Sequence, residues 1–275
     1  MLRAKIESNR RRLLTGLPPL FITRMFLGPP VICHVLVVIC SAPILGPIAG
    51  DHIMKRLLIA VALLFSIPAQ AASISLISEE TSDHPAVILI KGSFLKGEEN
   101  KDVHWFTGLI WTLKKPAIIF LDGNGGVLLG GIEIGELIRQ RGFSTVVDDH
   151  TACASTCALI WLAGKERYVG KFGHLGFHSA RTSEQPPQIS GPGNAMVGAY
   201  LYQMGVREYR EITFLTEQPP ISMKWVNLAD MISHDIYAEN FDPSQPRWAW
   251  AKAALDAYYR DSRNAIATSE AKAKD

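Results

Sequence analysis

Short apolar runs alternate with segments of helical spacing through the middle of the chain. Ala86–Lys91 and Ala117–Leu121 are rich in β-branched residues, which favours buried strands. Between them, Val103–Leu113 repeats its apolar residues at the spacing of a helix. Strands that alternate with helices in this way are typical of an α/β fold.

The same alternation continues toward the C-terminus. A helix is predicted over Val127–Arg141, because Gly142 stands where a helix commonly ends. The pattern further predicts strands at Phe143–Val147, Arg167–Val169 and His174–Phe177, helices at Ala154–Ala163, Asn194–Met204 and Arg247–Arg260, a loop over Ser179–Gly193 and a frayed tail from Ala265. With no internal repeat or long linker, we expect a single domain over residues 72–275.

Residues 54–71 have the pattern of a signal peptide. They read MKRLLIAVALLFSIPAQA, with two basic residues, a short apolar run, and small residues at Ala69 and Ala71. This order predicts cleavage after Ala71. The apolar run Leu57–Ile67 falls short of the roughly 20 residues of a membrane-spanning helix.

Two interpretations of residues 1–53 stay open. A signal peptide begins at its own initiator methionine, and Met54 stands at that place, so residues 1–53 are interpreted as an untranslated extension. The domain is then periplasmic or secreted. In the second interpretation residues 1–53 are a membrane anchor, with Arg10, Arg11 and Arg12 on the cytoplasmic side and the domain outside it. A membrane partner is expected only in that case.

Charge divides the chain at the same place. The whole sequence of 275 residues has a net charge of +2, but residues 1–71 hold eight basic and two acidic side chains. The remaining residues hold 20 basic and 24 acidic side chains. Residues 72–275 therefore lack the basic excess of nucleic-acid-binding proteins, so nucleic acid is not an expected partner.

Three segments carry candidate chemistry. The first, Leu121–Gly126, follows a strand with paired glycines, which form either a plain turn or a loop whose amides face an oxyanion. The second places Ser155 at the start of an apolar helix, as an ordinary N-cap or as a nucleophile. The third, His174–Arg181, contains His178 at a strand end, as a surface residue or as a base.

In this order the segments resemble the Clp-protease/crotonase superfamily, and especially its exported, periplasmic bacterial members. The motifs are CASTC at Cys153–Cys157, GFH at Gly176–His178 and YLYQMG at Tyr200–Gly205, and the likeness covers about residues 87–236. The resemblance implies a single α/β domain built as a repeated β-β-α spiral.

The resemblance also implies roles for individual residues. Ser155 is the expected nucleophile and His178 the expected general base. The backbone amides of Gly126 and Thr156 are the expected oxyanion hole. These roles suit the chemistry, because a neutral imidazole accepts the serine proton at neutral pH and two amides stabilise the oxyanion.

The third member of the triad is not evident. The family's acid is expected just before Trp225, where this sequence has Ile221, Ser222 and Met223. Asp230 lies 52 residues after His178 and is one candidate for the orienting acid. The alternative is a Ser–His dyad whose imidazole is held by a backbone carbonyl or by Ser222.

Cys153 and Cys157 flank Ser155, and they are either a disulfide or two packed small residues. Two cysteines without a partner pair make only half of a zinc site, so no metal is expected.

The favoured function is an exported serine hydrolase, a peptidase, that acts on a peptide or protein substrate without a cofactor. The first alternative is a catalytically degenerate Clp-like protein for binding or assembly, since the acid is missing. The second is a crotonase-type acyl-CoA enzyme, which export disfavours because acyl-CoA is a cytoplasmic substrate. Superfamily members commonly oligomerise, so a homo-oligomer is a further expectation.

Overall fold

The computed structural model describes residues 71–272. They lie in one compact unit, Pro68–Asp275. The predictions for residues 1–53, and for the signal segment as far as residue 70, fall outside the described residues. Within residues 71–272, no helix combines the length and the apolar character that crossing a membrane requires.

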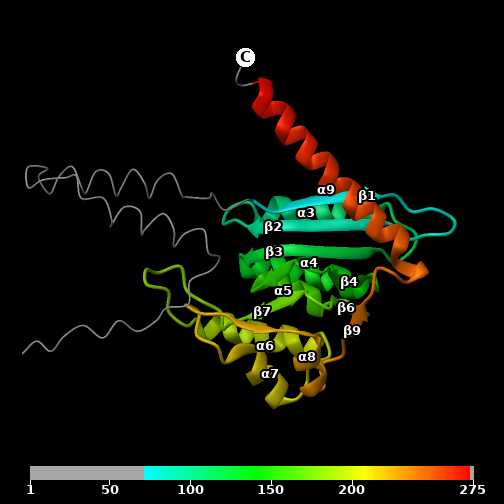
Figure 1. Ribbon diagram of the computed structural model, residues 1–275. Coiled ribbons are helices and arrows are strands. Elements are labelled where there is room, and N and C mark those ends of the chain that lie inside the picture. Colours follow the sequence, from blue (N-terminus) through cyan, green and yellow to red (C-terminus); the bar gives the residue numbers. More distant parts are fainter. Residues whose placement is uncertain (1–70, 273–275) are drawn as a thin grey trace, which may run out of the picture. The chain divides into compact units, whose positions relative to one another are not determined.

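Nine strands and seven helices make up the described part of the chain (Figure 1). The strands are β1 (Ser73–Ser78), β2 (Val87–Phe94), β3 (Ile118–Gly126), β4 (Ser144–Val147), β5 (Ala152–Ala154), β6 (Arg167–Gly170), β7 (His174–Phe177), β8 (Lys224–Val226) and β9 (Glu239–Phe241). The helices are α3 (Glu99–Trp111), α4 (Leu128–Gln140), α5 (Thr156–Leu162), α6 (Gly191–Gln203), α7 (Tyr209–Thr216), α8 (Leu228–Ser233) and α9 (Pro246–Lys272). The predicted α/β fold is confirmed.

Strand β3 is the branch point of the sheet. One side of β3 pairs with β2, while on the other side its first half pairs with β4 and its end pairs with β5. From β4 the sheet continues through β6 to β9, and from β5 it continues through β7 to β8. All of these pairs are parallel except β1–β2 and β7–β8. The carboxyl ends of β3, β5 and β7 therefore lie at one edge.

Helices cover both faces of the sheet, and the strands alternate accordingly. In β2, Ile88 and Ile90 belong to a large core cluster with the helices α3 to α7, whereas Val87 and Leu89 belong to a smaller cluster with α9. Successive strand residues point to opposite faces, so both faces must be apolar in a sheet buried on both sides. This requirement explains the continuous apolar runs in the sequence.

The C-terminal helix is longer than the sequence pattern predicted. Trp248, Ala251 and Leu255 are its buried residues, consistent with the amphipathic helix expected over Arg247–Arg260. The prediction of a frayed tail from Ala265 was wrong, because α9 continues to Lys272. Alanine, glutamate and lysine have high helix propensity, so these exposed last turns form without packing (Figure 1).

Candidate active site

Two of the candidate residues follow neighbouring parallel strands. Ala154 at the end of β5 is in register with Gly176 of β7. The next residue, Ser155, donates its backbone N–H to the carbonyl oxygen of Gly176 at 2.7 Å. His178 follows β7 directly. The sheet therefore brings Ser155 and His178 to the same edge.

The backbone of Ser155 is strained. Its φ is 56° and its ψ is −125°, which is unusual for any residue other than glycine. Ser155 occupies the N-cap position of α5, but its side chain makes no capping hydrogen bond. A strained residue of this kind costs about 1–3 kcal/mol and persists only where its surroundings hold it. The hydroxyl of Ser155 is thus not used in the way an ordinary N-cap serine uses it.

Gly125 and Gly126 lie beside Ser155. They are the last residues of β3 and pair with Ser93 and Phe94 of β2, so they continue the strand rather than form a plain turn. A Cβ atom on Gly125 would lie 2.8 Å from the Ser155 Cβ and 2.7 Å from the backbone nitrogen of residue 156. Only a residue without a side chain at position 125 therefore lets the end of β3 approach Ser155 this closely.

Thr156 ties the beginning of α5 to the end of β3. Its hydroxyl donates to the carbonyl oxygen of Gly126 at 3.0 Å. A Cβ on Gly131 of α4 would lie only 1.9 Å from the Cγ2 of Thr156, so α4 packs directly on this residue. These contacts place the two segments predicted for the oxyanion hole next to each other.

His178 is held by the backbone of the residue that follows it. Its Nδ1 lies 2.7 Å from the carbonyl oxygen of Ser179. The pKa of His178 is lowered, chiefly because burial penalises the charged imidazolium. The hydrogen bond to Ser179 opposes this shift, and the positive charge of Arg181 adds to it. The neutral imidazole, which is the form that acts as a base, is therefore favoured.

The positions considered for an orienting acid serve other purposes. The carboxylate of Asp230 accepts the backbone N–H of Asn227 at 2.9 Å, and the two residues form the capping box of α8. Ser222 donates to the carbonyl oxygen of Pro219 and is exposed. Within residues 71–272, no carboxylate forms an ion pair with His178. Of the groups considered for holding the imidazole, the structure provides a backbone carbonyl, that of Ser179.

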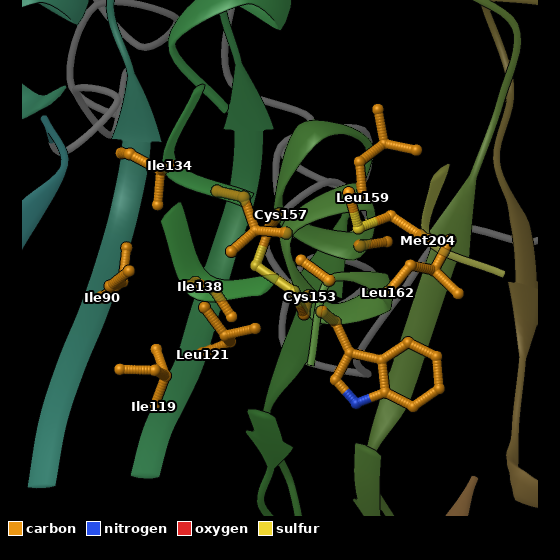
Figure 2. Close-up of a cluster of buried hydrophobic side chains, with 14 of the residues drawn as sticks. Ile90, Ile119, Leu121, Ile134, Ile138, Cys153, Cys157, Leu159, Leu162 and Met204 are labelled. Carbon is orange, nitrogen blue, oxygen red and sulfur yellow. A yellow bond between two sulfur atoms is a disulfide. The ribbon is translucent and has the colours of Figure 1, made fainter. Parts of the chain in front are cut away.

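A disulfide joins Cys153 and Cys157 across Ser155. Cys153 lies on β5 and Cys157 on α5, so the bond links the strand before the serine to the helix after it. Figure 2 shows the bond among buried aliphatic side chains, and both cysteines are buried. Among the described residues, no group of three or more potential ligands is placed to hold a metal ion.

Sequence reasoning missed two contributors to this site. Gly125 was treated as part of a turn, although it is the residue whose missing side chain lets β3 pack directly against Ser155. Asn194 was taken only as the beginning of a helix, although its side chain accepts the backbone N–H of Ala180 beside His178. An asparagine near a helix start resembles ordinary capping, so its spacing carried no signal.

Among known proteins, solved structures resemble this chain. No family model matches the chain, and no curated protein matches it. Solved structures that resemble it include a peptidase from Plasmodium falciparum, with 12% identity, coverage of 57% of this chain and 95% of that chain, and a TM-score of 0.44. The ClpP protease catalytic domain from Plasmodium falciparum has 13% identity, coverage of 56% and 83%, and a TM-score of 0.42.

A variant of ClpP1 from Listeria monocytogenes has 16% identity, coverage of 57% of this chain and 91% of that chain, and a TM-score of 0.42. Two of these structures are described as ClpP proteins and the third as a peptidase. The assignment of this chain to the exported members of the superfamily stays a prediction.

Proposed function

We propose that this protein is an exported serine hydrolase, a peptidase, with Ser155 as nucleophile and His178 as general base. The observation that carries the proposal is the backbone of Ser155. A strained serine whose hydroxyl caps nothing, placed beside a strand that a half-buried histidine follows directly, suits a nucleophile better than a structural residue.

In the proposed reaction, the Oγ of Ser155 attacks a peptide carbonyl while the Nε2 of His178 takes the serine proton. The backbone N–H groups of Gly126 and Thr156 stabilise the oxyanion of the tetrahedral intermediate. Thr156 is the first residue of α5, so its N–H has no acceptor within the helix. Loss of one such donor typically raises the barrier by about 2.7–4 kcal/mol.

Collapse of the intermediate breaks the C–N bond, and His178 gives its proton to the leaving amine. An acyl group then remains on Ser155. Water repeats the same steps, with His178 taking a proton from the water and returning it to the serine oxygen. The cycle consumes one water and needs no cofactor.

Labelling with a serine-reactive fluorophosphonate tests the proposal. We expect the wild-type chain to be labelled, the Ser155→Ala variant not to be labelled, and the Ser222→Ala variant to be labelled like wild type. Equal labelling of wild type and Ser155→Ala would contradict the catalytic role.

A second candidate is a catalytically degenerate protein for binding or assembly. The observation in its favour is the lack of an ion pair between His178 and a carboxylate within residues 71–272. In that case Ser155→Ala leaves the phenotype of the host unchanged, whereas disruption of an interface between copies abolishes it. Labelling of Ser155 separates the two candidates directly.

Export and assembly belong to the same proposal. Cleavage after Ala71 would release a periplasmic or secreted domain that acts on peptides and assembles as a homo-oligomer. Determination of the N-terminus of the protein made in its own host tests the export. A mature chain that begins near Ala72 supports it, and an intact Met1 contradicts it.

Asp230→Ala should affect stability but not labelling. Loss of the capping box at α8 is expected to lower the free energy of unfolding by about 1 kcal/mol. Asn227→Ala removes the other half of the box and is the matched control. Urea unfolding and fluorophosphonate labelling of both variants provide the measurement. If Asp230 instead orients His178, only Asp230→Ala will slow the labelling.

The labelling rate should persist at pH values below the range where an ordinary histidine titrates. The pKa of His178 is lowered by burial, so the imidazole stays neutral and able to accept a proton as the pH falls toward that lowered pKa. Arg181→Gln removes a positive charge that lowers this pKa and should move the acid limb to higher pH. A pH–rate profile of both proteins checks the direction, and an acid limb that stays in place argues against His178 as the base.

A further inference from the structure

The peptide group between Ser179 and Ala180 is hydrogen-bonded at both of its ends. Its carbonyl oxygen lies 2.7 Å from the Nδ1 of His178. Its N–H donates to the Oδ1 of Asn194 at 2.6 Å. The two atoms belong to one planar, conjugated amide, so an acceptor on the N–H makes the carbonyl oxygen a better acceptor.

Backbone hydrogen bonds hold the peptide groups on either side of the Ser179–Ala180 peptide. The N–H of Ser179 donates to the carbonyl oxygen of Gln218, and the carbonyl oxygen of Ala180 accepts from Ser190, both at 2.8 Å. Ser179 itself is buried. These bonds belong to the peptide groups on either side, so the bond from the Ala180 N–H to Asn194 is the one that opposes a turn of the Ser179–Ala180 peptide away from His178.

Asn194 is fixed as firmly. It lies in the first turn of α6, where its backbone N–H donates to the carbonyl oxygen of Ser190 at 2.9 Å. The hydroxyl of Ser190 in turn caps the helix by accepting the N–H of Gly193 at 3.1 Å. The side chain of Asn194 thus starts from a rigid helix end.

The direction of the hydrogen bond determines the tautomer of His178. A carbonyl oxygen can only accept, so the Nδ1 that faces it must carry the proton. In the neutral imidazole the Nε2 then has the free lone pair. This is the tautomer that a general base needs if Nε2 takes the serine proton.

We propose that Asn194 is a positioning residue that acts through the Ser179–Ala180 peptide to hold His178 in the Nδ1–H tautomer. The inference rests on the proposed function, in which His178 is the base. The peptide group occupies the role that a carboxylate has in a triad, but it is neutral.

A neutral acceptor has a distinct electrostatic consequence. Arg181 is the charged group that acts on His178, and it disfavours the imidazolium. On the neighbouring strand, Lys224 is paired with Glu217, so these two charges offset each other. The hydrogen bond to Ser179 raises the pKa of His178, but it lacks the additional rise that the negative charge of a neighbouring carboxylate produces.

The test is the ¹⁵N NMR spectrum of His178 in the full chain, assigned by its loss in His178→Gln. Wild type should show a protonated Nδ1 and an unprotonated Nε2 above its pKa. Asn194→Ala should show a mixture of tautomers and a fluorophosphonate labelling rate about tenfold lower, because the wrong tautomer cannot accept the proton. Gln203→Ala, an exposed change at the other end of α6, should alter neither.

Asn194→Asp provides a second readout. It keeps the acceptor and adds a negative charge, so it should restore the single tautomer, restore labelling and raise the pKa of His178, with the acid limb at higher pH. If Asn194→Ala does not fold, Asn194→Asp still decides, since an unchanged His178 pKa overturns the inference.

The outcomes separate this inference from the proposed function. A single tautomer that depends on Asn194, in a protein whose Ser155 is never labelled, supports the inference and contradicts the hydrolase. Labelling of Ser155, with a tautomer that does not respond to Asn194→Ala and a pH profile that does not respond to Asn194→Asp, supports the hydrolase and overturns the inference.

Discussion

Gly125→Ala should reduce the labelling of Ser155 at least a hundredfold and lower the free energy of unfolding by about 3 kcal/mol. The φ of Gly125 is +85°, where an L-residue is strained. Its Cβ would lie 2.6 Å from the carbonyl oxygen of Ala154 and 2.7 Å from the nitrogen of Thr156. Both are backbone atoms that cannot rotate away, so the methyl group pushes the Ala154–Thr156 segment away from β3 and separates the two amides predicted for the oxyanion hole.

Gly97→Ala is the matched control for this variant. Gly97 has a nearly equal φ of +89°, but its Cβ would meet nothing within 4 Å. It should therefore show the backbone strain alone, about 1–2 kcal/mol, with normal labelling. Thermal melting and labelling of both variants separate strain from obstruction. Equal behaviour of the two variants would show that the close approach of Gly125 to Ser155 has no catalytic use.

Part of the fold could be predicted from the sequence, and part could not. The elements β2, β3 and α4 followed from their patterns, because the two strands are buried on both faces and the helix is followed by Gly142. The three-residue strands β5, β8 and β9 were missed, since so short a segment has no measurable periodicity. They form because a longer neighbour offers a partner strand, which is a tertiary effect.

Part of the candidate site was likewise predicted from the sequence, and part was not. Ser155 and His178 were identified from their motifs, and the register of β5 with β7 explains how they reach one edge. A backbone carbonyl was one of the groups considered for holding His178, but which carbonyl was not predictable, because such a group has no side-chain signature. Ser179 and Asn194 are 15 residues apart, and only the packing of α6 beside the end of β7 brings them together.

Loss of the Cys153–Cys157 disulfide should impair both stability and labelling. The bond closes a very short loop, for which the chain-entropy estimate is about 2 kcal/mol. That loop contains Ser155, whose strained backbone must be held by its surroundings. Without the bond, relaxed conformations of Ser155 become populated, and we expect the labelling rate of the Cys153→Ala/Cys157→Ala variant to fall about tenfold, which corresponds to about 1.4 kcal/mol.

The two single variants provide the control for this effect. Each removes the same bond, so each should lose about as much as the double variant, which is the non-additive result expected of coupled residues. A reductant should slow the labelling of wild type and leave the double variant unchanged. Additive losses, or a wild type that reductant does not slow although alkylation shows both thiols free, would mean that the bond does not hold Ser155. The backbone of Ser155 would then be held only by the packing of β5 and α5 around two buried sulfur atoms.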